Sequence, residues 1–268
     1  MTDPIPLPLN PANIAALHTV LSCANMIAIA SGKGGVGKTW LSVTLCHALA
    51  KRGKRVLLFD GDFGLANVDI QLGLTPDKDL GHVIEGQTTL ANAITRYEEG
   101  GFDILAGRSG SGNLATLNAT TLSSLRSDLI ALAANYDHVF VDLGAGVDRA
   151  VRQMAGPAAI TYVVVTDEPT SLTDAYAFIK LSRAANPRAD MRIIVNMAAS
   201  TAEGQRTYDT IRKAAESFLS YRPPLVGIVR RDPKVRDAIR SQTPILVRYP
   251  TADAAADAES IALSILSP

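Results

Sequence analysis

The sequence predicts an α/β fold in which a doubly wound, mostly parallel sheet is covered by helices on both faces. Short apolar runs that are typical of strands alternate with helical stretches of about 10–17 residues. Some of these runs, such as 160–165 and 193–195, lack polar alternation, as strands buried on both faces do. A Gly-rich loop follows the first run, at the place where sheets of this class bind ligands.

The expected elements follow one another without an internal repeat or a convincing linker. After a proline-containing arm with a short helix at 13–22, the first strand is expected at 26–30 and the first long helix at 39–51. Further strands are expected at 55–60, 102–106, 138–142, 161–166, 192–196 and 225–229, and further helices at 121–134, 171–184, 203–219, 233–240 and 252–266. We therefore expect an amino-terminal arm at 1–24 and a single domain at 25–268.

The composition suits a protein with a sizeable core and a balanced charge. Of the 268 residues 47% are hydrophobic, and 26 basic residues balance 26 acidic ones, so no general field draws the chain to nucleic acid or anionic lipid. The two cysteines, Cys23 and Cys46, form neither a zinc pattern nor a disulfide framework. Because a signal peptide and a long apolar run are also missing, a cytoplasmic location is expected.

Residues 32–39 fit the G-x-x-x-x-G-K-[ST] pattern of a phosphate-binding loop, and they lie between an expected strand and an expected helix. The glycines allow backbone N–H groups to turn toward phosphates, and the helix amino terminus favours an anion. Lys38 is expected to reach the β- and γ-phosphates of ATP, and the Thr39 hydroxyl to bind Mg²⁺. The expected nucleotide-binding residues here are Gly32, Lys33, Gly34, Gly35, Val36, Gly37, Lys38, Thr39 and Trp40, with the Trp40 ring packed behind the loop.

Lys33 is a second lysine in this loop, and an ordinary phosphate-binding loop needs none at that position. The pair Lys33 and Lys38 resembles the deviant loop of the family that includes MinD, ParA and the nitrogenase iron protein. The resemblance implies that ATP builds a homodimer in which Lys33 crosses the interface and reaches the phosphates of the other subunit. It also implies slow, partner-stimulated hydrolysis of ATP to ADP and phosphate.

Three aspartates follow expected strands and are candidates for the hydrolytic chemistry. Asp60 and Asp62 come at the end of the second strand, where one carboxylate can support the Mg²⁺ water shell and another can position the attacking water. The family resemblance assigns Asp62 to the water and Asp60 to the Mg²⁺ shell. Asp142 ends an apolar run in the Walker B manner and is expected to hold Mg²⁺ through water, with a flexible loop at 143–146 beside the γ-phosphate.

The base-binding end of the site is assigned by resemblance alone. In MinD-like proteins an Asn in the position of Asn196 reads the adenine, and an Asp in the position of Asp232 belongs to the same region. Arg230 stands where the family usually has Pro. The preference for ATP over GTP also comes from the family, since the sequence has no Asn-Lys-x-Asp motif.

Outside the nucleotide site the chain resembles one branch of the family, the flagellar-number regulators called FlhG or FleN. The stretches 62–69, 72–74, 80–86, 168–180, 195–197 and 203–204 carry this resemblance. It implies control of the number or placement of flagella through a flagellar assembly or transcription-regulator partner, and a cytoplasmic protein that can be recruited to a cell pole. Two features depart from the branch. No basic residue follows Arg248, so the tail is not expected to bind anionic membrane, and residues 1–25 lack the motif that activates a partner GTPase.

Other classes of function remain open alternatives. A ParA-type positioning ATPase for DNA or another cargo would need a basic surface, for which the candidates are Arg206, Arg212, Lys213, Arg230, Arg231, Lys234 and Arg236. An iron–sulfur reductase would need bridging cysteines in the central loops, which are absent. ATP-dependent amide synthases share the fold but generally lack a lysine at the position of Lys33. No specific nucleic acid is expected as a partner.

Overall fold

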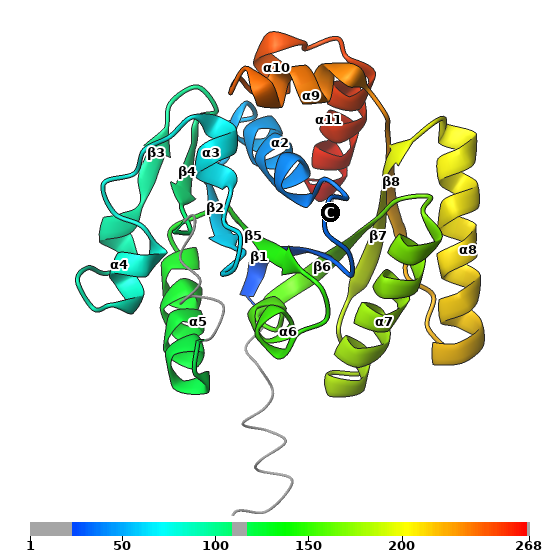
Figure 1. Cartoon of the computed structure of the whole chain (residues 1–268), viewed down its shortest axis with the longest axis horizontal. Coiled ribbons are helices and arrows are strands. Elements are labelled where there is room, and N and C mark those ends of the chain that lie inside the picture. Colours follow the sequence, from blue (N-terminus) through cyan, green and yellow to red (C-terminus); the bar gives the residue numbers. More distant parts are fainter. Residues whose placement is uncertain (1–22, 109–116, 267–268) are drawn as a thin grey trace, which may run out of the picture.

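The structure, a computed structural model, describes residues 23–108 and 117–266. Its strands form one sheet in the order β3-β4-β2-β5-β1-β6-β7-β8, and each neighbouring pair is parallel except β3 and β4 (Figure 1). The strands are β1 (Cys23–Ser31), β2 (Val56–Gly61), β3 (Thr95–Tyr97), β4 (Phe102–Leu105), β5 (His138–Ala145), β6 (Ala158–Val165), β7 (Met191–Ala198) and β8 (Leu225–Arg230). The predicted α/β class with a mostly parallel sheet is confirmed.

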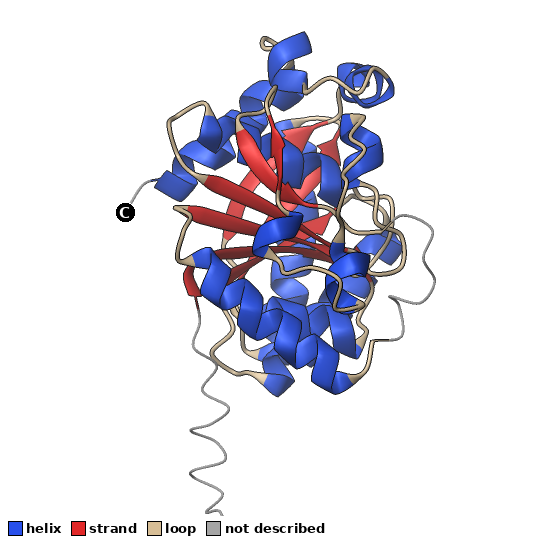
Figure 2. Cartoon of the chain, turned by 90° about the vertical axis from the view of Figure 1, so that its left-hand side faces the viewer, coloured by secondary structure: helices blue, strands red, loops and turns tan. Residues whose placement is uncertain are grey.

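Helices cover both faces of this sheet (Figure 2). The helices are α2 (Lys38–Ala50), α3 (Val68–Leu72), α4 (Leu80–Ile84), α5 (Ala119–Ala133), α6 (Arg149–Ala155), α7 (Pro169–Ala185), α8 (Thr201–Leu219), α9 (Pro233–Arg240), α10 (Ile245–Arg248) and α11 (Asp253–Leu266), with a 3₁₀ turn at Ala91–Ala93. One core cluster joins the sheet to α5, α6, α7 and α8, and the other joins it to α2, α9, α10 and α11.

The central strands supply both clusters because successive side chains point to opposite faces. In β1, Met26 and Ala28 belong to the first cluster, whereas Ile27 and Ile29 belong to the second. All four side chains are at most 5% exposed, so β1 is apolar on both faces, as the sequence pattern predicts.

The strand order places the Gly-rich loop at a reversal of the sheet. β5 and β6, which follow each other along the chain, lie on opposite sides of β1. Ligands of open parallel sheets bind at the carboxyl ends of strands where such a reversal occurs. The loop 32–37 leaves β1 at that edge and leads into α2.

Each long element expected from the sequence is present, with boundaries shifted by a few residues. The short elements β3, α3, α4, α6 and α10 were not predicted, since three to seven residues carry little periodicity. The expected loop at 143–146 is wrong for its first three residues. β5 continues to Ala145 because Leu143 still pairs with Gly61 of β2 and Ala145 with Ser31 of β1.

The expected amino-terminal arm and its helix at 13–22 fall outside the described residues. Within the described part of the chain, no helix combines the length and the apolar character that a membrane crossing requires.

Candidate nucleotide site

The Gly-rich loop has the backbone conformation of a cradle. Gly35 and Gly37 have φ angles of 78° and 86°, a region that disfavours other residues. A Cβ placed on Gly35 would meet nothing within 4 Å, so space adjoins the loop there. Gly37 is the N-cap of α2, and the N–H of Leu41 donates to its carbonyl at 3.1 Å. The amino terminus of a 13-residue helix therefore faces the loop.

Lys38 is held at the base of the loop. Its Nζ donates to Ser31 Oγ at 2.9 Å, and Ser31 Oγ donates in turn to the carbonyl of Lys33 at 2.6 Å. Lys38 is 8% exposed, and this burial lowers its pKa, while the charges of Asp142 and Asp62 oppose the shift. The cation thus lies between the loop and two carboxylates.

Thr39 and Asp142, the two residues expected at the metal, lie in contact. The Thr39 hydroxyl hydrogen-bonds the Asp142 carboxyl, and Ser42 Oγ donates to Asp142 Oδ1 at 3.0 Å. Asp142 is 1% exposed, and burial raises its pKa to about 6. Ser42 was not predicted as a site residue, although it lies four residues after Lys38 and therefore on the same face of α2.

Asp60 lies opposite Asp142 on the adjacent strand and organises the segment that follows it. Its Oδ1 accepts from the N–H of Asp62 at 3.2 Å, and its Oδ2 from the N–H groups of Asn67 and Val68 at 3.1 and 3.2 Å. Burial, together with the charge of Asp142, raises the pKa of Asp60 to about 7. These contacts anchor the 62–68 loop at the sheet edge, and a role for Asp60 in the Mg²⁺ shell stays a prediction.

Asp62 lies over the end of β5. Its Oδ1 accepts from the N–H groups of Gly64 and Leu65 at 3.3 and 3.0 Å, which closes a tight turn. A Cβ on Gly144 would come within 3.1 Å of the same oxygen, so the carboxylate rests against the backbone of β5. Asp62 therefore shares the site with Lys38 and Asp142, as its proposed role requires.

Lys33 contacts the start of α7. Its Nζ hydrogen-bonds a Glu168 carboxylate oxygen and donates to Thr170 Oγ1 at 2.9 Å. The hydrogen bond to Glu168 and the charge of Lys33 lower the pKa of that carboxyl. The loop and α7 also meet through their backbones, since a Cβ on Gly32 would lie 2.1 Å from the carbonyl carbon of Asp174. The segment 168–180 thus packs directly on the phosphate loop.

The two residues assigned to the base have other partners in this structure. Asn196 is 3% exposed, and its Nδ2 donates to the carbonyl of Val36 at 2.8 Å. Asp232 is the N-cap of α9, and its Oδ1 accepts from the N–H of Lys234 at 2.9 Å. Their assignment to adenine stays a prediction.

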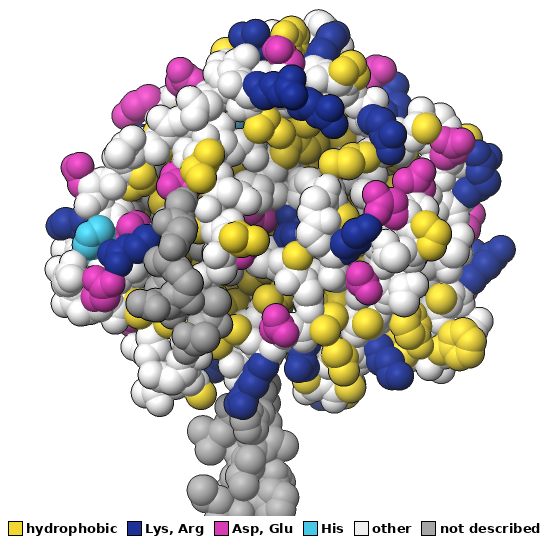
Figure 3. Space-filling model, viewed as in Figure 1, with side chains coloured by type: hydrophobic (Ala, Val, Ile, Leu, Met, Phe, Trp, Pro, Cys, Tyr) yellow, Lys and Arg dark blue, Asp and Glu magenta, His cyan; other side chains and the backbone are white. Residues whose placement is uncertain are grey.

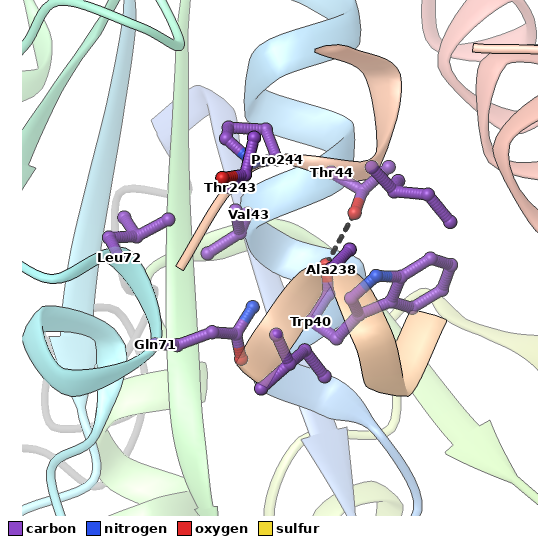
Figure 4. A pocket seen from close by; sticks show the side chains of 10 residues that line it. Trp40, Val43, Thr44, Gln71, Leu72, Ala238, Thr243 and Pro244 are labelled. Atoms are coloured by element: carbon purple, nitrogen blue, oxygen red, sulfur yellow. Dashed lines mark hydrogen bonds between the residues drawn. The ribbon is translucent and has the colours of Figure 1, made fainter. Parts of the chain in front are cut away.

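Trp40 is buried, and its expected place behind the phosphate loop stays a prediction. Its ring is 5% exposed and borders a small pocket of about 10 Å³ between α2, α3 and α9 (Figure 4). The dashed line in that view is the bond from Thr44 Oγ1 to the Trp40 carbonyl, 2.7 Å long. The indole N–H has no hydrogen-bond partner among the described residues.

This chain is similar in sequence to known nucleotide-binding proteins. The model of the CobQ/CobB/MinD/ParA nucleotide-binding domain matches residues 27–245. The antiactivator FleN of Pseudomonas aeruginosa is 37% identical over 252 residues, which cover 94% of this chain and 88% of FleN. The flagellum site-determining protein YlxH of Helicobacter pylori is 34% identical over 194 residues, or 72% of this chain and 65% of YlxH.

Among solved structures, the septum site-determining protein MinD of Pyrococcus horikoshii in complex with Mg-ADP superimposes with a TM-score of 0.77. The match covers 90% of this chain and 96% of MinD at 23% identity, a level that supports the fold alone. The matched domain and the relative that is 37% identical lead to one conclusion about the family. The chain belongs to the CobQ/CobB/MinD/ParA nucleotide-binding family and, within it, to the branch that contains FleN.

Proposed function

We propose that this chain is an ATPase that dimerises with ATP and controls the number or placement of flagella by binding a protein partner in one nucleotide state. The observation that carries the proposal is the packing of the phosphate loop on α7, through Lys33 with Glu168 and Thr170. The relationship to FleN and to the flagellum site-determining protein YlxH supports the flagellar assignment.

The donor set of the site fits Mg-ATP. The open side of Gly35, the buried Lys38 cation and the Thr39–Asp142 contact provide N–H donors, a positive charge and oxygen ligands, which phosphates and Mg²⁺ require. Bound Mg²⁺ would neutralise charge that develops on the phosphates. Thr39 would bind the ion directly, Asp142 and Asp60 would hold its water ligands, and Asp62 would orient the water that attacks the γ-phosphate. Asn196 and Asp232 are the proposed contacts on the adenine side.

The proposed switch acts through Lys33. In the monomer this lysine is engaged by Glu168 and Thr170 of its own chain. In the ATP dimer it would leave them and reach the phosphates of the second subunit, which changes the surroundings of α7. A partner bound at the exposed side of α7 would therefore have different affinities for the two states, and that difference is what a regulator requires. Slow hydrolysis, stimulated by the partner, would reset the cytoplasmic protein, including any copy recruited to a cell pole.

The ParA-type alternative is weakened by ion pairing. Of the seven candidate cations, Arg206 pairs with Glu203, Arg212 with Asp209 and Glu216, and Arg230 with Asp253 and Asp257. Lys and Arg side chains do gather over α9 and α10 (Figure 3), where Lys234, Arg236 and Arg240 are exposed. Salt-sensitive, ATP-dependent binding to random duplex DNA would favour this alternative.

The test pairs genetics with biochemistry. Deletion of the gene is expected to change the number or position of flagella, counted by electron microscopy, and restoration of the gene should reverse the change. In parallel, Asp62→Asn protein loaded with ATP and wild-type protein loaded with ADP serve as baits for partner capture. A deletion strain with normal flagella would remove the flagellar assignment. Equal capture by both baits would show that partner binding does not depend on the nucleotide state.

A further inference from the structure

The carboxyl end of β7 contains a bulge beside the phosphate loop. Val195 pairs with Ile228 and Ala198 with Arg230, so β7 advances three residues where β8 advances two. Within this bulge Met197 has a φ of 57°, a conformation that is uncommon for a residue other than glycine. Bulges and backbone outliers of this kind often re-aim a side chain next to a functional site.

The side chain that the bulge presents to the loop is Asn196. Its Nδ2 donates to the carbonyl of Val36 at 2.8 Å, and the residue is 3% exposed. The next loop residue, Gly37, allows the close approach. A Cβ on Gly37 would lie 2.4 Å from Asn196 Nδ2 and 3.3 Å from Met197 Cε. Asn196 and Met197 together therefore form one wall against the Val36–Gly37 peptide.

This contact fixes the direction of a peptide group. In a trans peptide the C=O and the following N–H point to opposite sides. Because the Val36 carbonyl is turned toward Asn196, the N–H of Gly37 is turned away from it. Phosphate loops bind their ligand through backbone N–H groups that point into the loop while the carbonyls point outward.

We propose that Asn196, presented by the Met197 bulge, is a positioning residue for the phosphate loop, so that binding of any triphosphate depends on it whether or not a base is attached. The proposal rests on the proposed nucleotide site and deepens it. It differs from the adenine assignment in a measurable way, because a base-reading residue affects only ligands that carry the base. A positioning residue weakens the binding of both ATP and inorganic tripolyphosphate, whereas a lost adenine contact would weaken the binding of ATP alone.

The experiment measures dissociation constants of Mg-ATP and Mg-tripolyphosphate by calorimetry. Asn196→Asp keeps the shape of the side chain but places a carboxylate oxygen against the Val36 carbonyl, and Asn196→Ala removes the donor. Loss of one buried hydrogen bond predicts affinities weaker by about tenfold for both ligands. The matched control is Asn25→Asp at the other end of β1, where the amide donates to the carbonyls of Ala133 and Tyr136. The control should lower thermal stability without changing either affinity.

A weaker ATP affinity with unchanged tripolyphosphate affinity would overturn the proposal and support adenine reading. Unchanged affinity for both ligands would also overturn it. If neither Asn196 variant folds, Asn196→Ser decides, because its shorter polar side chain withdraws the donor from the Val36 carbonyl, and it is expected to weaken the binding of both ligands. Unchanged affinities in that variant overturn the proposal. Wild-type protein that binds neither ligand would overturn the nucleotide site itself and this inference with it.

Discussion

Lys33 donates a hydrogen bond to Thr170 Oγ1 at 2.9 Å, across 137 positions of the sequence. With the neighbouring bond to Glu168, this contact joins the phosphate loop to the first turn of α7 within one chain. If Lys33 reaches the phosphates of a second subunit, as proposed, its side chain would turn away from these two partners. Nucleotide-driven dimerisation would therefore be coupled to the release of α7.

The two loop lysines should separate binding from dimerisation. Lys38→Ala is expected to weaken ATP binding by about a hundredfold, because the buried cation at the base of the loop is lost. Lys33→Ala should leave ATP affinity within about threefold but should prevent the ATP dimer, since among the described residues its Nζ contacts Glu168 and Thr170 and no residue of the phosphate loop. Calorimetry and sedimentation velocity measure the two properties. A Lys33→Ala protein that dimerises fully with ATP would sink the deviant-loop interpretation.

Substitution of Glu168, which hydrogen-bonds Lys33, should have the opposite effect on dimerisation. Glu168→Gln removes the carboxylate charge that holds the lysine, while the amide keeps the size of the side chain. The side chains of Lys33 and Glu168 are 37% and 59% exposed, so water screens the pair and its loss should have little effect on the stability of the fold. We expect ATP-dependent dimerisation to strengthen by up to about fivefold in sedimentation equilibrium. A weaker dimer would show that Glu168 acts in the dimer itself.

Asp62 closes a turn and has a proposed chemical role, and two variants can separate the two. Asp62→Ala removes the oxygen that accepts from Gly64 and Leu65, whereas Asp62→Asn keeps an acceptor there and removes only the charge. Both variants should bind ATP and dimerise, and both should lose turnover by about a hundredfold if the carboxylate orients the attacking water. Phosphate release measures turnover, with Asp77→Asn on the exposed loop as control. Normal turnover in Asp62→Asn would make Asp62 a turn residue only.

The core of the site was predictable from the sequence because chain order fixes it. The strand, Gly-rich loop and helix place Lys38 and Thr39, and parallel pairing of β1 with β5 brings Asp142 beside them. The contacts of Lys33 with Glu168 and Thr170 carry no such signal, since both partners read as ordinary residues at a helix start. The bulge at Met197 could not be predicted either, because a methionine in the sequence does not indicate a positive φ.

Buried His47 should make the fold sensitive to acid. It is 4% exposed in α2, its Nδ1 has no partner among the described residues, and burial with the charge of Lys51 lowers its pKa to about 4. The unfolded chain, with a pKa near 6.5, binds the proton more readily, so stability is lost as pH falls from about 6.5 to 4. Relative to wild type, His47→Leu should gain about 2–3 kcal/mol over this window in urea unfolding. If the free energy of unfolding changes with pH in the same way in both proteins, His47 does not have the lowered pKa.

The carboxyl-terminal helix should not bind anionic membrane. α11 carries Asp253, Asp257 and Glu259, and two of these acids pair with Arg230. No basic residue follows Arg248 in the chain. Anionic vesicles would repel such a helix, so the purified protein should stay in the supernatant when liposomes rich in phosphatidylglycerol are pelleted, with or without ATP. ATP-dependent pelleting would point to a lipid-binding surface elsewhere on the molecule.

The exposed side of α7 should carry the partner surface. Lys180 is exposed there, nearly two helical turns beyond Asp174, whose backbone packs on Gly32. Lys180→Glu is therefore expected to weaken capture of the flagellar or transcription-regulator partner by about tenfold while ATP affinity stays unchanged. Asp174→Arg should weaken capture too, but it also places a bulky side chain next to the phosphate loop, so its ATP affinity is expected to fall as well. Lys213→Glu on exposed α8 is the matched charge reversal and should leave both properties intact. If Lys180→Glu and Lys213→Glu capture the partner equally well, the partner surface lies away from α7.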